Sequence, residues 1–115
     1  MIITVSPDQG SPARQIQDQI SGLITTGRLG RGERLPSVRQ LASDLDVAPG
    51  TVAKVYRSLE ADGLLVSRAG SGTRVSDQAA PVSSAVAQAA RRLAGAARRE
   101  DLSLEEAVLV LRMTW

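Results

Sequence analysis

Two short amphipathic segments follow each other with only Asp46-Val47-Ala48 between them, and this spacing constrains the fold most. Residues 38–45 repeat apolar side chains at helical intervals, and so do residues 49–62. Pro49 suits the first turn of a new helix, and Gly63 ends that helix. Two helices joined by so tight a corner have to cross and share one core, so the sequence predicts a helix-turn-helix.

The details of the corner support this prediction. Ser37 and Gln40 have the spacing of a capping box at the start of the first helix. Asp46 stands at the end of that helix, where aspartate tolerates a left-handed backbone. Tyr56 has two interpretations, a stacking platform for a base or a core residue, and its helical phase favours the core. The two apolar faces consist of Val38, Leu41, Ala42 and Leu45, and of Val52, Val55, Tyr56 and Leu59.

A further helix precedes the corner and a hairpin follows it. Ile2 to Val5 predicts a short edge strand, and Ser11-Pro12 predicts the start of a helix that runs to about Thr26. Residues 27–32 form a loop, in which a plain turn is favoured over a phosphate-binding loop because no lysine accompanies it. Residues 64–67 and 73–75 predict two short strands with a glycine-rich, basic tip between them.

The last part of the chain predicts two more helices beyond a hinge at residues 77–81. One runs from about Val82 to Arg99, and the other begins with a capping box at Ser103 and Glu106. The expected fold is therefore mainly α with a small β-hairpin. It consists of a winged helix-turn-helix domain over residues 1–78 and a two-helix dimerisation tail over residues 79–115.

Composition excludes several classes of function. The chain has no histidine and no cysteine, which removes most transition-metal sites and the usual nucleophile–base pairs. We therefore expect no metal, no cofactor and no enzymatic activity, because no carboxylate or Ser–Lys constellation is evident either. No signal peptide and no membrane span are evident, and the absence of cysteine fits a cytoplasmic protein.

The positions of the cations indicate more than their number, since the formal net charge is only +2. The side of the helix over residues 49–62 that faces away from its core carries Gly50, Lys54, Arg57 and Ala61, flanked by Thr51, Ala53 and Ser58. Small residues with two cations suit a helix pressed against phosphates, although a solvated face is the plain alternative.

The predicted hairpin is also basic. Its tip and flanks carry Arg68, Gly70, Ser71, Gly72 and Arg74, which suit DNA contact or, alternatively, a charged edge that blocks pairing with another strand. The loop arginines Arg28, Arg31 and Arg34 either form a phosphate patch or solvate the loop, and the sequence leaves this open.

Residues 12–75 carry a series of short motifs, namely Gly27-Arg28-Leu29, Gly32, Leu35-Pro36-Ser37-Val38-Arg39-Gln40-Leu41-Ala42, Thr51-Val52, Leu59-Glu60-Ala61-Asp62-Gly63-Leu64-Leu65 and Gly70-Ser71-Gly72-Thr73. With these motifs the segment resembles the DNA-binding domain of the GntR family of bacterial transcription regulators. The short tail is similar to that of the YtrA subfamily. The resemblance implies DNA contacts for Arg39, Thr51 and Gly70. Ala48 replaces the usual capping serine of the family. Pro49 and Gly50 stand where many relatives have arginine or asparagine, which implies a weaker or different base readout, and Ala53 stands where some have a second arginine.

Together these observations predict a DNA-binding surface and a dimerisation surface. The tail stripe has no partner of its own, so a homodimer is favoured over a tail that folds back on its own domain. The DNA-binding set is Arg39, Gly50, Thr51, Lys54, Arg57, Ser58, Arg68, Gly70, Ser71, Gly72 and Arg74. The dimerisation set is Val82, Val86, Ala89, Leu93, Leu104, Val108 and Leu111.

The expected function is a sequence-specific transcriptional regulator, a repressor, that binds a two-fold operator in double-stranded DNA as a homodimer. The alternative is a winged-helix module that contacts proteins without specific DNA binding. RNA recognition by stacking is disfavoured because Tyr56 and Trp115 are the only aromatic residues. No small-molecule effector is indicated.

Overall fold

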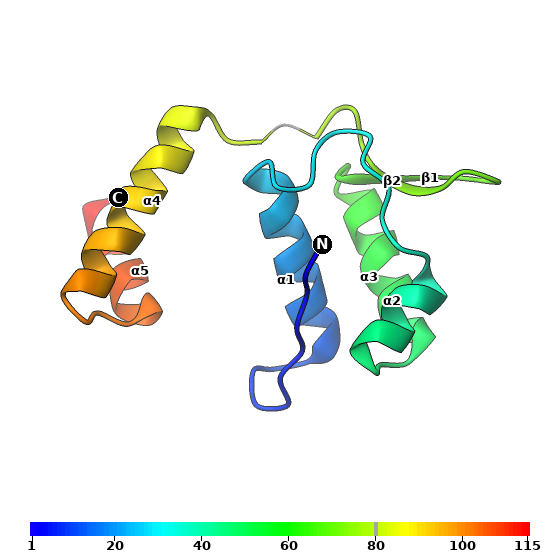
Figure 1. Ribbon diagram of the computed structural model, residues 1–115, viewed down its shortest axis with the longest axis horizontal. Coiled ribbons are helices and arrows are strands. Elements are labelled where there is room, and N and C mark those ends of the chain that lie inside the picture. The colour runs from blue at the N-terminus through cyan, green and yellow to red at the C-terminus, as the bar shows by residue number, and fades with distance from the viewer. Residues whose placement is uncertain (80) are drawn as a thin grey trace. The chain divides into compact units, whose positions relative to one another are not determined.

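The computed structural model describes residues 1–79 and 81–115. They form two compact units, Met1–Pro81, called here the winged unit, and Val82–Trp115, called the tail unit. The winged unit contains α1 (Pro12–Thr25), α2 (Val38–Leu45), α3 (Pro49–Ala61), β1 (Leu65–Arg68) and β2 (Gly72–Val75), and the tail unit contains α4 (Ser84–Arg99) and α5 (Leu104–Thr114) (Figure 1). The predicted mainly α fold with one hairpin is confirmed. Ala80, inside the predicted hinge, lies outside the described residues.

Serine caps set the starts of most helices. The hydroxyls of Ser11, Ser37, Ser83 and Ser103 each accept a backbone N–H from the first turn of their helix. At Ser103 the capping box is complete, because Glu106 returns a bond to the Ser103 N–H. The predicted box at Ser37 is only half formed, since the Gln40 side chain donates to Asp44 instead, at 2.7 Å. Asp46 ends α2 with φ of 54°, as predicted.

The core of the winged unit lies where α1 and α2 pack against α3. Its fully buried side chains are Ile16, Ile20, Val52, Val55, Leu59 and Val75. Tyr56 belongs to this core with 3% of its surface exposed, and its hydroxyl donates to the Pro36 carbonyl at 2.8 Å. The core interpretation of Tyr56 is therefore correct. Burial raises the pKa of Tyr56 to about 12, because the charged phenolate would be poorly solvated there.

The N-terminal segment differs from the prediction. No strand forms at Ile2 to Val5, because no other strand lies beside it. The Gln19 side-chain amide instead accepts from the Thr4 N–H at 3.0 Å and donates to the Thr4 carbonyl at 2.7 Å. Gln15 bonds both backbone groups of Ser6 in the same way, each at 2.8 Å. Two glutamines on α1 thus supply the hydrogen bonds that a neighbouring strand would have supplied.

The winged unit also extends further than the sequence predicted. Ala79 is buried with the core, although the sequence predicts that the tail begins at this residue. The Arg31 Nε donates to the Ala79 carbonyl at 2.9 Å, which ties this end of the unit to the loop after α1. The boundary between the two compact units falls between Pro81 and Val82, whereas the sequence predicts it after residue 78.

The hairpin is antiparallel, and a third segment of the chain joins it. Leu65 pairs with Val75, Val66 with Arg74, Ser67 with Thr73 and Arg68 with Gly72. Residues 32–35 lie along the free edge of β2, with three backbone hydrogen bonds of 2.9 Å to Thr73 and Val75. Arg34 stands opposite Arg74 in this arrangement. In Figure 1 the hairpin extends beyond the three helices of the winged unit, which is the form of a wing.

Candidate nucleic-acid interface

The outward side of α3 is small and basic. Lys54 and Arg57 are exposed, and Gly50 is exposed with open space where a side chain would stand. Thr51 is half-buried, and its N–H donates to the Ala48 carbonyl at 3.0 Å. Ala48 supplies no side-chain cap, and α3 begins with Pro49, Gly50 and Thr51, none of which has a long side chain. The backbone of a polyanion could therefore approach this helix closely, with two exposed cations, Lys54 and Arg57, beside it.

Ser58 lies one turn after Lys54 on α3 and is half-buried. Its hydroxyl accepts a hydrogen bond of 2.9 Å from the Gln17 side chain on α1. The structure therefore uses this predicted DNA contact to join two helices of the winged unit. Arg39, by contrast, stands exposed in the first turn of α2, where no apolar packing restrains it.

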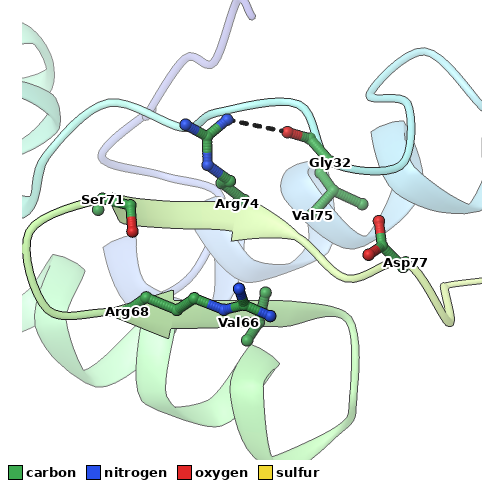
Figure 2. Close-up of a pocket in the computed structure, with 8 residues that line it drawn as sticks. Gly32, Val66, Arg68, Ser71, Arg74, Val75 and Asp77 are labelled. Atoms are coloured by element: carbon green, nitrogen blue, oxygen red, sulfur yellow. Dashed lines mark hydrogen bonds between the residues drawn. The ribbon is translucent and has the colours of Figure 1, made fainter.

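The wing carries its predicted residues around a shallow hollow of about 140 Å³. Figure 2 shows Arg68 on β1 and Arg74 on β2 at this hollow, with Ser71 near the tip and Asp77 at the opposite end. Gly70 and Gly72 have φ values of 82° and 76°, a left-handed backbone that favours glycine. The Arg74 guanidinium donates to the Gly32 carbonyl at 3.2 Å, so its position is partly fixed.

The cations of α3 and the wing have no carboxylate partners. Across residues 1–79 and 81–115, the only ion pair within 4.0 Å joins Arg14 to Asp18 on the surface of α1. Exposed cations without partners are available to phosphates, which bind arginine through paired hydrogen bonds. In the same described residues no group of three acidic side chains could hold a metal ion, and no helix has the length and apolar character to cross a membrane.

The tail unit contains an apolar groove between α4 and α5, with a volume of about 730 Å³. Six of the seven predicted dimerisation residues line it, namely Val86, Ala89, Leu93, Leu104, Val108 and Leu111. Val82 precedes α4 and lies outside the groove. Trp115 also lines the groove and was not predicted; its side chain is 99% exposed. The groove is an unpartnered surface on which a second apolar element could pack.

Sequence reasoning also missed the part that the loop arginines play. Arg34 belongs to the segment that pairs with β2, and its guanidinium nitrogens lie 3.3 Å from where a Cβ of residue 72 would stand. The alternation of exposed Arg34 with buried Leu35 before a proline is a weak strand signal that was available in the sequence. The partner strand is about 40 residues away, which a local pattern does not reveal.

The sequence of this chain matches one family of known proteins. Residues 12–75 match the bacterial regulatory proteins of the gntR family. The HTH-type transcriptional regulator Rv1152 of Mycobacterium tuberculosis is 38% identical over 97 residues, covering 84% of this chain and 79% of that protein. The HTH-type transcriptional repressor YtrA of Bacillus subtilis is 37% identical over 79 residues, covering 68% of this chain and 61% of that protein.

Solved structures agree with these relatives. YtrA from Sulfolobus acidocaldarius, a GntR-family transcription factor, is 34% identical with a TM-score of 0.61, over 84% of this chain and 99% of that one. The DNA-binding domain of AraR in complex with operator ORE1 is 26% identical with a TM-score of 0.54, over 66% of this chain and 94% of that one. These neighbours confirm the predicted winged helix-turn-helix fold. The relatives are transcriptional regulators, which confirms the prediction of a regulator rather than an enzyme. The chain belongs to the GntR family of bacterial transcriptional regulators and is YtrA-like.

Proposed function

We propose that this chain is a repressor that binds a two-fold operator as a homodimer in the cytoplasm. The winged unit places α3 in the major groove and the wing in the adjacent minor groove, while the tail unit holds two protomers together. The observation that carries the proposal is the outward side of α3, where Lys54 and Arg57 are exposed without carboxylate partners among the described residues. The operator complex of AraR and the repressor name of YtrA support it.

The DNA contacts we propose follow from exposure and charge. On α3 they are Gly50, Thr51, Lys54 and Arg57, joined by Arg39 from the first turn of α2. On the wing they are Arg68, Gly70, Ser71, Gly72 and Arg74, and all of these except Gly70 line the hollow. We leave Ser58 out of the set, because its hydroxyl is bonded to Gln17.

A salt series tests duplex binding. We expect the full chain to select operator-bearing fragments from genomic DNA and to lose about 10³–10⁵ in affinity between about 50 and 200 mM salt, as six to ten phosphate contacts require. Lys54→Ala should weaken binding without changing helicity, since Lys54 is exposed. Arg14→Ala is the matched control, because Arg14 is an exposed cation on α1 that is paired with Asp18. A flat salt response would favour the alternative, a protein-contact module.

The dimer rests on the apolar groove of the tail unit. Val86, Val108 and Leu111 are 42–55% exposed in the single chain, although large apolar side chains in a stable helical pair are normally covered. A second copy offers the same surface, and closed two-fold pairing would cover both grooves at once. It would also match a two-fold operator with two copies of α3 at a fixed spacing.

Truncation after Pro81 tests the dimer, because the winged unit with Ala79 in its core is then left whole. We expect a folded monomer whose operator affinity is lower by about 10²–10⁴, the avidity that linkage of two heads provides. Sedimentation of both proteins and DNA titrations measure this. A full chain that remains monomeric at high micromolar concentration, or a truncation that binds as tightly as the full chain, would refute the dimer.

A further inference from the structure

The wing has two faces with different chemistry, and only one of them packs on the hydrophobic core. The inner face carries Leu65 and Val75 into the core, and the Ser67 hydroxyl donates to Glu60 on α3 at 2.7 Å. The alternation of side chains along the strands places Val66, Arg68, Gly72 and Arg74 on the opposite face. Arg34 joins them, since it stands directly opposite Arg74. We call Arg34, Arg68 and Arg74 the outer wing arginines.

The outer wing arginines are arranged at a cost to the fold. Like charges that face each other across an antiparallel pair destabilise the pairing, and Arg34 faces Arg74 without a carboxylate within 4.0 Å in the described part of the chain. All three residues are exposed. An anion between these guanidinium groups would remove the repulsion, so the arrangement suits the binding of an anion better than an ion-pair network.

Backbone groups hold two of these arginines in place. The Arg34 Nε and Nη2 lie 3.3 Å from where a Cβ of residue 72 would stand, so the guanidinium rests on the wing because residue 72 is glycine. Arg74 is held from the other side by its bond to the Gly32 carbonyl, which Figure 2 shows as a dashed line. The Arg74 guanidinium is therefore partly positioned before any ligand arrives, which lowers the entropy lost on binding.

The geometry of the minor groove indicates which phosphates are available. This groove is about 6 Å wide and is bounded by two phosphate backbones. A hairpin that enters it turns one face toward each backbone. The inner wing face is directed to α3, and hence to the backbone between the two grooves that the protein occupies. The outer face is directed to the other backbone, beyond the base pairs that α3 covers.

We propose that the outer wing arginines form a second phosphate-binding site, which takes the DNA backbone on the far side of the minor groove, with Arg34 as a contact residue and Gly72 as the residue that positions it. This inference rests on the proposed DNA binding. It assigns a function to Arg34, and it predicts that each half-site of the operator extends past the wing.

The test compares two lengths of DNA. Arg34→Gln is made in the full chain and titrated against an operator fragment with long flanks and against one that ends just past the wing. On the long fragment we expect a salt slope lower by about 1 per protomer, and therefore by about 2 for a dimer. On the short fragment Arg34→Gln should bind like the parent, while Lys54→Ala should weaken binding to both fragments.

A matched control separates position from net charge. Arg28 is another exposed arginine of the loop after α1, outside the outer wing arginines, and Arg28→Gln should keep the parent's slope on both fragments. The proposal is overturned if Arg34→Gln binds the long fragment like the parent, if Arg28→Gln loses as much, or if the Arg34→Gln loss is equal on the short fragment. Failure of the parent itself to bind duplex DNA would instead refute the proposed function.

A double-mutant cycle tests the role of Gly72. Gly72→Ala should lower the slope in the parent and add little in the Arg34→Gln background, because its effect passes through Arg34. Gly63→Ala controls for backbone strain, since Gly63 has φ of 78° and open space around it. Equal effects of Gly72→Ala in both backgrounds would remove Gly72 from the positioning role, and thermal unfolding of each variant shows whether the wing is intact.

Discussion

Tyr56→Phe should reverse its effect on stability between neutral and alkaline pH. At pH 7 the change removes the hydrogen bond from the Tyr56 hydroxyl to the Pro36 carbonyl, which is 2.8 Å long and lies in the core. Such a bond contributes about 0.5–1.5 kcal/mol to the free energy of unfolding. For a unit of this size, 1 kcal/mol corresponds to about 4–8 °C in the midpoint of thermal unfolding. The phenylalanine variant is therefore the less stable protein at neutral pH.

At high pH the pKa of Tyr56 acts in the other direction. The pKa is about 12 in the folded chain against an ordinary value of 10.0, so the fold favours the protonated phenol. This contribution is fully present below pH 10 and is lost as the pH rises through 12, because the unfolded chain ionises first. Two pKa units correspond to about 2.7 kcal/mol. The parent should lose this amount relative to the variant, and the two stability curves should cross near about pH 11.

The assay is direct because Tyr56 is the only tyrosine. The ultraviolet absorbance of tyrosinate gives its titration in the folded chain, and urea unfolding of parent and variant at several pH values gives the free-energy difference. Titration of other groups cancels in this difference. If Tyr56 titrates near pH 10 in the folded chain, or if the two stability curves stay parallel, then burial does not hold the phenol protonated and our account of this core position is wrong.

Three further changes have definite expected outcomes. Ala48→Ser supplies the missing cap of α3 and should raise the free energy of unfolding by about 1 kcal/mol, measured by thermal melting; no gain would mean that the α3 N-terminus is already satisfied. Ser58→Ala should lower stability by about 1 kcal/mol and leave DNA affinity unchanged, so a loss of affinity with intact stability would return Ser58 to the interface. Hydrogen bonds from Ser103 lower the pKa of Glu106. Their contribution to the stability of α5 is therefore present above the ordinary glutamate pKa and is lost as the pH falls through the lowered value. Acid titration of the helical circular dichroism should show this loss in the parent and not in Ser103→Ala.

Local signals in the sequence were sufficient wherever the physical cause is local. The caps at Ser11, Ser37 and Ser103, the left-handed Asp46 and the apolar phase of Tyr56 depend on residues within one or two turns, and all were predicted. The cap at Ser83 was not predicted. The prediction that Gln40 completes the capping box at Ser37 was wrong for a related reason. The Gln40 side chain donates instead to Asp44, one turn further along α2. A pattern states which bonds are possible, and competition between acceptors decides which of them form.

Pairings between distant segments were not predictable from one sequence. Ile2 to Val5 has the composition of a strand, but its backbone partners are the side chains of Gln15 and Gln19, which no strand pattern includes. Arg34 has little strand character of its own, and it pairs with β2 because the core places the two segments side by side. For the proposed DNA interface, the sequence identified the exposed cations, whereas the hydrogen bond between Ser58 and Gln17 became evident only in three dimensions.

The bare first turn of α3 has a consequence for how operators would be found in a genome. Pro49, Gly50 and Ala53 carry no hydrogen-bonding side chains, so few base edges in the major groove can be read there directly. On the binding mode proposed above, discrimination would come largely from how readily a sequence bends or narrows its minor groove under the wing. Operators of this kind would have similar DNA stiffness rather than similar base sequence. A search for a strict consensus would overlook many of them, and alignment by predicted groove width should recover them.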